Sequence, residues 1–400
     1  MRNSEAEKPV GLVTVVVTAV GALIGQGIIR SLRMSGLSVR VIGVDRDPRG
    51  IGPYWCDAFF AKPAFDESSE AYLDFWKNLL IDENVDLVLP GLELDVLFFS
   101  RNRAVFADLD ARIVLNDPAV IELAQDKWDF GLELERLGLP TIPARLGAGW
   151  AQCARDLGLP LLLKPRQGNG SRGIAVLRDE DDFNYWSRKS TDAFLIQKFI
   201  GSDEQEFTVG AFGFGDGTAL APIIFRRKLS VAGNTQYAEV VEHPLLVEAV
   251  TRLATIFKPE GPTNYQFRMD GETPYLLEIN PRFSSSTSLR AAFGYNEAAM
   301  SVEYYLWRKK PLPPEIRPGR GWRYYRRLRG DMIGIISDVH GNLPALKAVL
   351  EKIDALGCET IISLRRCRRL LRAAGGMRRS AARSGCLQYP WQPRSLHRQR

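Results

Sequence analysis

The most specific chemical signal in this 400-residue chain is the segment YLLEINPRFSSSTSL, residues 275–289. Glu278 and Asn280 are separated by one residue on an expected strand, so their side chains point to the same face. Carboxylate and amide oxygens are hard ligands that suit Mg²⁺. Arg282 follows two residues later and could bind a phosphoryl oxygen, while Gln266 on the preceding expected strand could face the same metal. A charged hairpin edge is the alternative, but the string favours a site for metal and phosphate.

Two lysines flank a glycine-rich loop and could bind a polyphosphate. Lys127 lies early in an expected helix, and Lys164 ends the apolar strand LPLLLKP, where an unpaired lysine would be costly to bury. The loop that follows, residues 167–173, contains Gly168 and Gly170, and its backbone N–H groups could hold phosphate oxygens. By itself such a loop is more often a hairpin turn, so the lysines carry the prediction.

A third segment, LIQKFIGSDEQEFTV, residues 195–209, could complete a nucleotide site. Glu206 begins an expected strand, and its carboxylate could accept hydrogen bonds from two ribose hydroxyls. A solvated acidic turn over residues 202–206 is the alternative, and this segment alone favours the turn.

The elements that must position these residues change character along the chain. The first hundred or so residues alternate apolar strands with helices, which predicts a small parallel sheet. The expected strands cover residues 13–18, 39–44, 85–89 and 112–115, and the expected helices cover residues 28–34 and 70–80.

Glycines at positions 21, 25 and 27 follow the first expected strand, and Asp45 ends the second. Their order is G-x-x-x-G-x-G, which differs from the dinucleotide-binding pattern G-x-G-x-x-G. Tight turning and close packing of helix on sheet is the favoured interpretation.

Beyond this region the pattern is α+β with an antiparallel sheet. Asp117 as N-cap and Pro118 at the first helical position predict a helix that runs to about Leu137. A helix is expected at about residues 245–257. The expected strands cover residues 161–164, 174–177, 194–198, 206–214, 219–225, 236–241, 264–269 and 275–279.

The net charge of +6 is confined to the C-terminal end. Residues 365–400 contain 11 arginines and no lysine or acidic residue, so residues 1–364 carry a formal charge of −5. The tail has few aromatic residues and no helical stripe, which argues against specific nucleic-acid recognition.

Five scattered cysteines and the short apolar run at residues 12–24 predict a reduced, cytoplasmic protein with no membrane partner. Three histidines leave little for a zinc site or a histidine triad.

With these motifs in order, residues 13–313 resemble the ATP-grasp superfamily, and specifically its carbamoyl-phosphate-synthase-like branch. The resemblance rests on Asp126-Lys127, LLLKP with its glycine loop, EFTV, NYQF and EINPRFSSST. It implies an N-terminal α/β parallel-sheet domain of Rossmann-like, pre-ATP-grasp type. An α+β ATP-grasp fold of two subdomains would follow, with ATP between them.

The resemblance also implies a role for each site residue. Arg282 and Lys164 would be catalytic, and Gln266, Glu278 and Asn280 would bind Mg²⁺ or Mn²⁺. The residues implied to bind ATP are Lys127, Lys164, Gly168, Gly170, Ser171, Gln197, Lys198, Ile200, Glu204 and Glu206. Gln197 stands where many relatives carry Glu, which puts the adenine contact in doubt.

The implied activity is an ATP- and Mg²⁺-dependent carboxylate–amine ligase that forms a C–N bond. Its partners would be a small-molecule carboxylate and an amine or ammonia, and a homodimer is possible. An ATP-binding module without ligase activity is the alternative, motivated by Gln197. A single ATP-grasp unit argues against carbamoyl phosphate synthesis itself.

A second resemblance begins at Met332, where MIGIISDVHGNLPALKAVLE is similar to the first motif of calcineurin-like metallophosphoesterases. Asp338 and His340 would be its metal ligands, but the later GD and GNH motifs are missing, so we expect a truncated fragment without phosphatase activity.

The expected domains are a Rossmann-like domain at 10–117, an ATP-grasp domain at 118–312, a linker at 313–330, the fragment at 331–364 and a disordered arginine-rich tail at 365–400.

Overall fold

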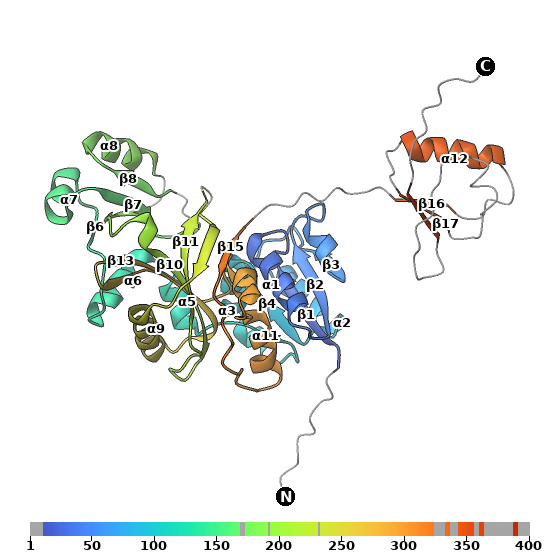
Figure 1. Cartoon of the computed structure of the whole chain (residues 1–400), viewed down its shortest axis with the longest axis horizontal. Coiled ribbons are helices and arrows are strands. Elements are labelled where there is room, and N and C mark those ends of the chain that lie inside the picture. The colour runs from blue at the N-terminus through green and yellow to red at the C-terminus, as the bar shows by residue number, and fades with distance from the viewer. Residues whose placement is uncertain are drawn as a thin grey trace, which may run out of the picture. The chain divides into compact units, whose positions relative to one another are not determined.

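The computed structural model divides the chain into two compact units, Met1–Arg323 and Tyr324–Arg400, which are described separately. The structure describes residues 11–168, 173–190, 193–230, 233–323, 333–336, 343–355, 360–363 and 387–390 (Figure 1). Among these residues, no helix is both long and apolar enough to cross a membrane.

The first unit begins with a five-stranded parallel sheet in the order β3-β2-β1-β4-β5. A small parallel sheet was predicted, but strand β3 was not. Its strands are β1 (Val13–Thr18), β2 (Val39–Asp45), β3 (Ala58–Ala61), β4 (Leu87–Leu89) and β5 (Arg112–Ile113). Its helices are α1 (Leu23–Met34), α2 (Glu70–Asp82), α3 (Glu93–Arg101) and α4 (Arg103–Phe106), with a 3₁₀ turn η1 (Gly52–Trp55).

Strand β1 is apolar at successive positions because both faces of the sheet are covered. Val15 and Val17 belong to a cluster with Ile28 of α1, whereas Val16 packs in a separate cluster with Trp76 of α2. Period-two alternation therefore sends neighbouring valines into two different cores.

The glycines after β1 serve close packing, as expected. A Cβ on Gly25 would lie 2.3 Å from the carbonyl oxygen of Ala19, which no side chain tolerates. The backbone N–H of Gly21 donates to Asp45 Oδ2 at 2.7 Å, so this carboxylate is used within the domain.

Two antiparallel sheets follow in the same unit. The smaller has the order β6-β9-β7-β8 and the larger the order β14-β13-β10-β11-β12-β15. The smaller sheet contains β6 (Ala144–Leu146), β7 (Leu161–Pro165), β8 (Ala175–Leu177) and β9 (Phe194–Lys198), with α7 (Trp150–Leu157) and α8 (Glu180–Lys189). The strands of the larger sheet are β10 (Glu206–Phe214), β11 (Ile223–Leu229), β12 (Thr235–Val240), β13 (Glu260–Asp270), β14 (Thr273–Asn280) and β15 (Arg320–Trp322). The other helices are α9 (Pro244–Phe257), α10 (Thr287–Ala292), α11 (Glu297–Ser301), a 3₁₀ turn η2 (Asp203–Gln205) and a π-helical turn η3 (Val302–Leu306).

The single helix expected between Asp117 and Leu137 is instead two helices, α5 (Pro118–Leu123) and α6 (Lys127–Arg136). The break occurs because Asp126 caps the second helix, accepting hydrogen bonds from the backbone N–H groups of Trp128 at 2.9 Å and Asp129 at 3.2 Å. This cap places Lys127 at the first helical position, next to the small sheet.

Two boundaries differ from the sequence expectation. Strand β15 lies inside the expected linker and pairs with β12, with Trp322 opposite Tyr237, so this part of 313–330 belongs to the large sheet. In the second unit β18 (Leu387–Pro390) lies inside the expected disordered tail and pairs with β17 (Thr360–Ser363). Backbone pairing at an open sheet edge orders both short segments.

The rest of the second unit has β16 (Ile333–Ile336) parallel to β17, with α12 (Leu343–Ala355) between them in the chain. The resemblance to a metallophosphoesterase fragment stays a prediction, because Asp338 and His340 lie outside the described residues.

Candidate active site

One cavity of about 450 Å³ lies where the two antiparallel sheets meet loops of the parallel-sheet domain. It collects most of the residues singled out from the sequence: Lys127, Lys164, Gly168, Gln197, Lys198, Ile200, Glu206, Gln266, Glu278, Asn280 and Arg282 all line it. Glu204 is the exception, because it lies exposed on η2 outside the cavity lining, where its neighbour Asp203 contributes instead. Gly170 and Ser171 lie outside the described residues.

The two lysines occupy the small-sheet side of the cavity. Lys164 is the next-to-last residue of β7 and is only 9% exposed, and its ammonium donates to Gln197 Oε1 on β9 at 2.7 Å. Burial lowers the pKa of Lys164 to about 8, although nearby Glu278 opposes this shift. The ammonium of Lys127 donates to the carbonyl oxygen of Gly168 at 2.7 Å, and burial lowers its pKa as well. Both ammonium groups therefore lie near the start of the glycine-rich loop.

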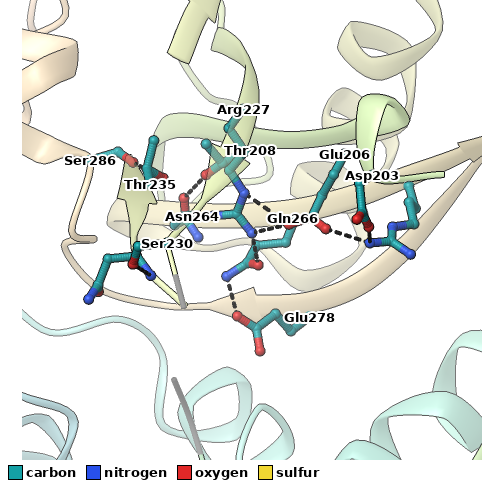
Figure 2. Close-up of polar contacts among 12 residues, drawn as sticks. Asp203, Glu206, Thr208, Arg227, Ser230, Thr235, Asn264, Gln266, Glu278 and Ser286 are labelled. Atoms are coloured by element: carbon teal, nitrogen blue, oxygen red, sulfur yellow. Dashed lines mark hydrogen bonds and ion pairs between the residues drawn. The ribbon is translucent and has the colours of Figure 1, made fainter. Parts of the chain in front are cut away.

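The expected metal-binding side chains lie on the neighbouring strands β13 and β14, where Gln266 is paired with Glu278 (Figure 2). Glu278 Oε1 accepts from Asn280 Nδ2 at 2.9 Å and also from Gln266 Nε2. The amide oxygens of Gln266 and Asn280 accept from Arg227 and Arg282. One carboxylate and two amide oxygens thus lie together on adjacent strands, and hard oxygen donors of this kind fit a site for Mg²⁺.

Arg227 is a further site residue, and it lies in the basic run Arg226–Lys228. Side chains alternate along β11, so Arg226 and Lys228 are exposed while Arg227 is 6% exposed and faces the cavity. Its guanidinium donates twice to Glu206 Oε1, at 3.1 and 2.9 Å (Figure 2).

Glu206 is held by a second arginine as well, since Arg268 donates to its Oε2 at 2.9 Å. Burial alone would raise the pKa of this carboxyl, but the two guanidinium groups outweigh burial and lower it. The carboxylate expected to meet only a ribose is therefore already paired on both oxygens.

A second arginine–glutamate pair, Arg290 and Glu297, is buried behind residues that line the cavity and does not line it itself. Arg290 and Glu297 are 0% and 1% exposed, and Arg290 Nη1 donates to Glu297 Oε1 at 2.8 Å. Arg290 also donates to Thr208 Oγ1 and Asn264 Oδ1, which belong to the cavity wall. A Cβ on Gly210 would lie 2.5 Å from the Arg290 guanidinium, so only glycine leaves room for it.

The parallel-sheet domain adds three lining residues that the sequence analysis missed: Ile24, Leu92 and Glu93. Glu93 begins α3, and its carboxylate accepts from Arg282 Nη2 at 2.8 Å. A signal for it was present, because the string PGLELD follows β4, and ligands of open parallel sheets bind outside the carboxyl ends of the strands.

Comparison with known proteins extends these observations. The family model described as "ATP-grasp in the biosynthetic pathway with Ter operon" matches residues 190–326. The carbamoyl phosphate synthase large chain of Kineococcus radiotolerans is 28% identical over 190 residues, which are 43% of this chain and 17% of the relative. That of Pyrococcus furiosus is 25% identical over 240 residues, 54% of this chain and 22% of the relative. The chain thus spans about a fifth of the length of these curated relatives.

Solved structures share the fold of the first unit. N5-carboxyaminoimidazole synthetase of Staphylococcus aureus with ADP aligns with a TM-score of 0.60 and 15% identity, covering 76% of this chain and 80% of that one. L-amino acid ligase of Bacillus licheniformis gives 0.57 and 19%, covering 77% of each. The biotin carboxylase domain dimer of Hydrogenobacter thermophilus 2-oxoglutarate carboxylase, with MgADP and bicarbonate, gives 0.58 and 16%, covering 77% and 73%. The fold class predicted from the sequence is confirmed.

Proposed function

Because the chain has the ATP-grasp fold, and carbamoyl phosphate synthase large chains are among its relatives, we propose that it is an ATP- and Mg²⁺-dependent carboxylate–amine ligase. One observation carries the proposal. A single cavity brings together the buried Lys164, the half-buried Lys127, an oxygen-donor set and Arg282, from three separate parts of the chain. That combination suits a nucleoside triphosphate with its metal and a transferring phosphoryl group.

In this proposal the small sheet holds the nucleotide. Lys127 and Lys164 bind the α- and β-phosphates, and the loop 166–172 closes over them. The adenine lies against Gln197, Lys198 and Ile200. A carboxylate offers about four acceptor positions, and the three hydrogen bonds that Arg227 and Arg268 donate to Glu206 leave room for a ribose hydroxyl.

Glu278, Asn280 and Gln266 would hold one or two Mg²⁺ or Mn²⁺ ions, which neutralise charge on the β- and γ-phosphates when bound. The protein's own contribution is to present one carboxylate and two amide oxygens from adjacent strands. Arg227 and Arg282, which now occupy the amide oxygens, would turn toward phosphate oxygens.

The proposed chemistry has two steps. A substrate carboxylate oxygen attacks the γ-phosphorus of ATP, the bond to the β-phosphate oxygen breaks, and ADP leaves. The amine nitrogen then attacks the carbonyl carbon of the acyl phosphate, the C–O bond breaks, and phosphate leaves with the electron pair and a proton from the amine. Arg282 stabilises the phosphoryl group in both steps, and the closed cavity excludes water.

The proposal is tested by ADP and phosphate release from the full chain with MgATP and a matrix of small carboxylates and amines. At least one pair should stimulate release and yield an amide detectable by mass spectrometry. Glu278→Gln should abolish stimulation, whereas Glu272→Gln, an exposed residue on the same β13–β14 hairpin, should not change it. Nucleotide binding without stimulation by any pair would instead support the ATP-binding module that Gln197 suggested.

We also propose that the chain forms a homodimer, in line with the dimer described for the Hydrogenobacter domain. Sedimentation velocity on the full chain tests this directly, because a single monomer species across a concentration series contradicts it.

A further inference from the structure

The amide side chain of Asn264 lies in the cavity wall beside the proposed metal-binding set. Asn264 is two residues before Gln266 on β13 and directly opposite Asn280 on β14, so the three side chains lie on one face of the large sheet. Asn264 is 2% exposed and lines the cavity. This buried amide is therefore close to where the metal and the γ-phosphoryl group would lie.

The orientation of this amide is fixed by two donors to its oxygen. Thr208 Oγ1 donates to Asn264 Oδ1 at 2.7 Å (Figure 2), and Arg290 Nη2 donates to the same atom. A guanidinium offers no acceptor, so the amide atom beside it must be the oxygen. Gly210, the neighbour of Asn264 on β10, leaves the space that the guanidinium occupies. The amide nitrogen therefore faces away from Arg290.

The amide nitrogen of Asn264 is a donor without a protein acceptor. It carries two N–H groups and, across the part of the chain that the structure describes, donates to no other residue. The neighbouring amides differ, because Gln266 Nε2 and Asn280 Nδ2 both donate to Glu278. A buried donor that lacks an acceptor is unfavourable, so this part of the cavity favours a ligand that brings an oxygen.

The proposed function supplies two kinds of oxygen. Phosphate oxygens would meet cations, namely Lys127, Lys164, Arg282 and the metal. A substrate carboxylate has one oxygen that attacks the γ-phosphorus and a second that has no group assigned to it. A neutral N–H donor next to the metal-binding set suits this second oxygen, which carries less charge than a phosphate.

We propose that Asn264 Nδ2 donates to the substrate carboxylate oxygen that is not phosphorylated; this inference rests on the proposed function. When the other oxygen bonds to the γ-phosphorus and ADP leaves, the held oxygen becomes the carbonyl oxygen of the acyl phosphate. When the amine nitrogen bonds to the carbonyl carbon, the held oxygen becomes an oxyanion, and its double bond re-forms as the C–O bond to phosphate breaks. Asn264 would thus stabilise one oxygen atom through both steps.

The test uses the full chain with Mg²⁺–ATP and neutral hydroxylamine, which converts an acyl phosphate into a hydroxamate that iron(III) colours. The carboxylates are acetate, succinate and the proteinogenic L-amino acids. Asn264→Asp keeps an oxygen for Arg290 and Thr208 and replaces the Nδ2 donor by an oxygen that repels the carboxylate. Asn264→Ala removes the donor without adding charge.

Both variants should lower kcat/KM for the carboxylate about 100-fold, as expected on losing one donor to an oxyanion. The dissociation constant for Mg²⁺–AMP-PNP, titrated calorimetrically, should change at least about ten times less, because the proposed contact is to the carboxylate and not to phosphate. Gln236→Glu is the matched control for the added charge, since Gln236 is an exposed amide on β12 of the same sheet and is absent from the described cavity lining. It should leave both quantities unchanged.

Failure of this inference is distinguishable from failure of the proposed function. If no carboxylate yields a hydroxamate with the unaltered chain, the ligase activity is wrong and the inference falls with it. If the unaltered chain is active and either Asn264 variant keeps its kcat/KM, the inference alone is wrong. Loss of Mg²⁺–AMP-PNP affinity as large as the loss of activity would also overturn it, because Asn264 would then serve the nucleotide.

Discussion

Two arginine–glutamate clusters, one on helices α10 and α11 and one on strands β10 and β11, have the same chemistry and different surroundings. Arg290 and Glu297 are enclosed and do not line the cavity. Arg227 and Glu206 are nearly as buried, but they line the cavity and share Gln266 with the candidate metal site. A buried ion pair with one partner removed destabilises a protein strongly, whereas a pair beside a cavity can exchange partners with a ligand. We therefore expect the closed pair to act on stability and the open cluster on binding.

The largest effect should come from Arg290→Met, which leaves the Glu297 carboxylate buried without its cation. We expect a loss of about 3–5 kcal/mol in the free energy of unfolding, measured by urea denaturation. The double variant with Glu297→Gln should recover part of the loss, because no uncompensated charge remains. A stability change below about 1 kcal/mol in the single variant would break the distinction between the two clusters.

Glu278→Gln should produce the next largest effect, and on binding rather than on folding. Removing the one carboxylate of the metal-binding set should lower the affinity for the Mg²⁺–nucleotide complex about 100-fold. Losing a residue that only supports a metal ligand already costs up to about this much. Isothermal titration with Mg²⁺–ADP measures this. Affinity for metal-free ADP should change little, and equal losses in both titrations would contradict a role in metal binding.

Arg227→Met tests the comparison directly, since it removes the arginine of the cluster that lines the cavity. Glu206 keeps Arg268, so the free energy of unfolding should fall by only about 1–3 kcal/mol. Arg226→Met on the same strand removes an exposed pair with Glu239 and should cost about 0–1 kcal/mol. A loss for Arg227→Met as large as that for Arg290→Met would show that the cavity cluster is a structural element as well.

The smallest effect is a pH dependence set by Lys164. Its ammonium is the form that binds phosphate, and the pKa near 8 means that the free protein loses this charge above pH 8. The dissociation constant for Mg²⁺–ADP should be flat below pH 8 and rise by about tenfold per pH unit above it, until the pKa of the complex is reached. Lys164→Arg should remove the rise that begins near pH 8, because a guanidinium does not titrate there, and leave only the contribution of Lys127. A flat profile in the unaltered chain would contradict a phosphate contact.

Local sequence patterns predicted much of this structure. The strands expected at residues 194–198 and 206–214 have those bounds in the structure. Both are rich in the aromatic and β-branched residues that favour strands. The strand expected at 219–225 is instead Ile223–Leu229. Because residues 226–228 lay outside the expected strand, the sequence could not say which of these basic side chains faces inward. The orientation of Arg227 was therefore not predicted.

The sequence by itself determined which residues could meet a nucleotide and a metal. One intervening residue on a strand places Glu278 and Asn280 on one face in any fold that keeps the strand, and a lysine at the end of an apolar strand demands a polar partner. Only the tertiary structure decided what those groups meet. Glu93 reaches Arg282 from 189 positions away along the chain, and Glu206 is claimed by two arginines from other strands. Such contacts depend on sheet register and on the packing of one domain against another, and neither is encoded in the spacing of nearby residues.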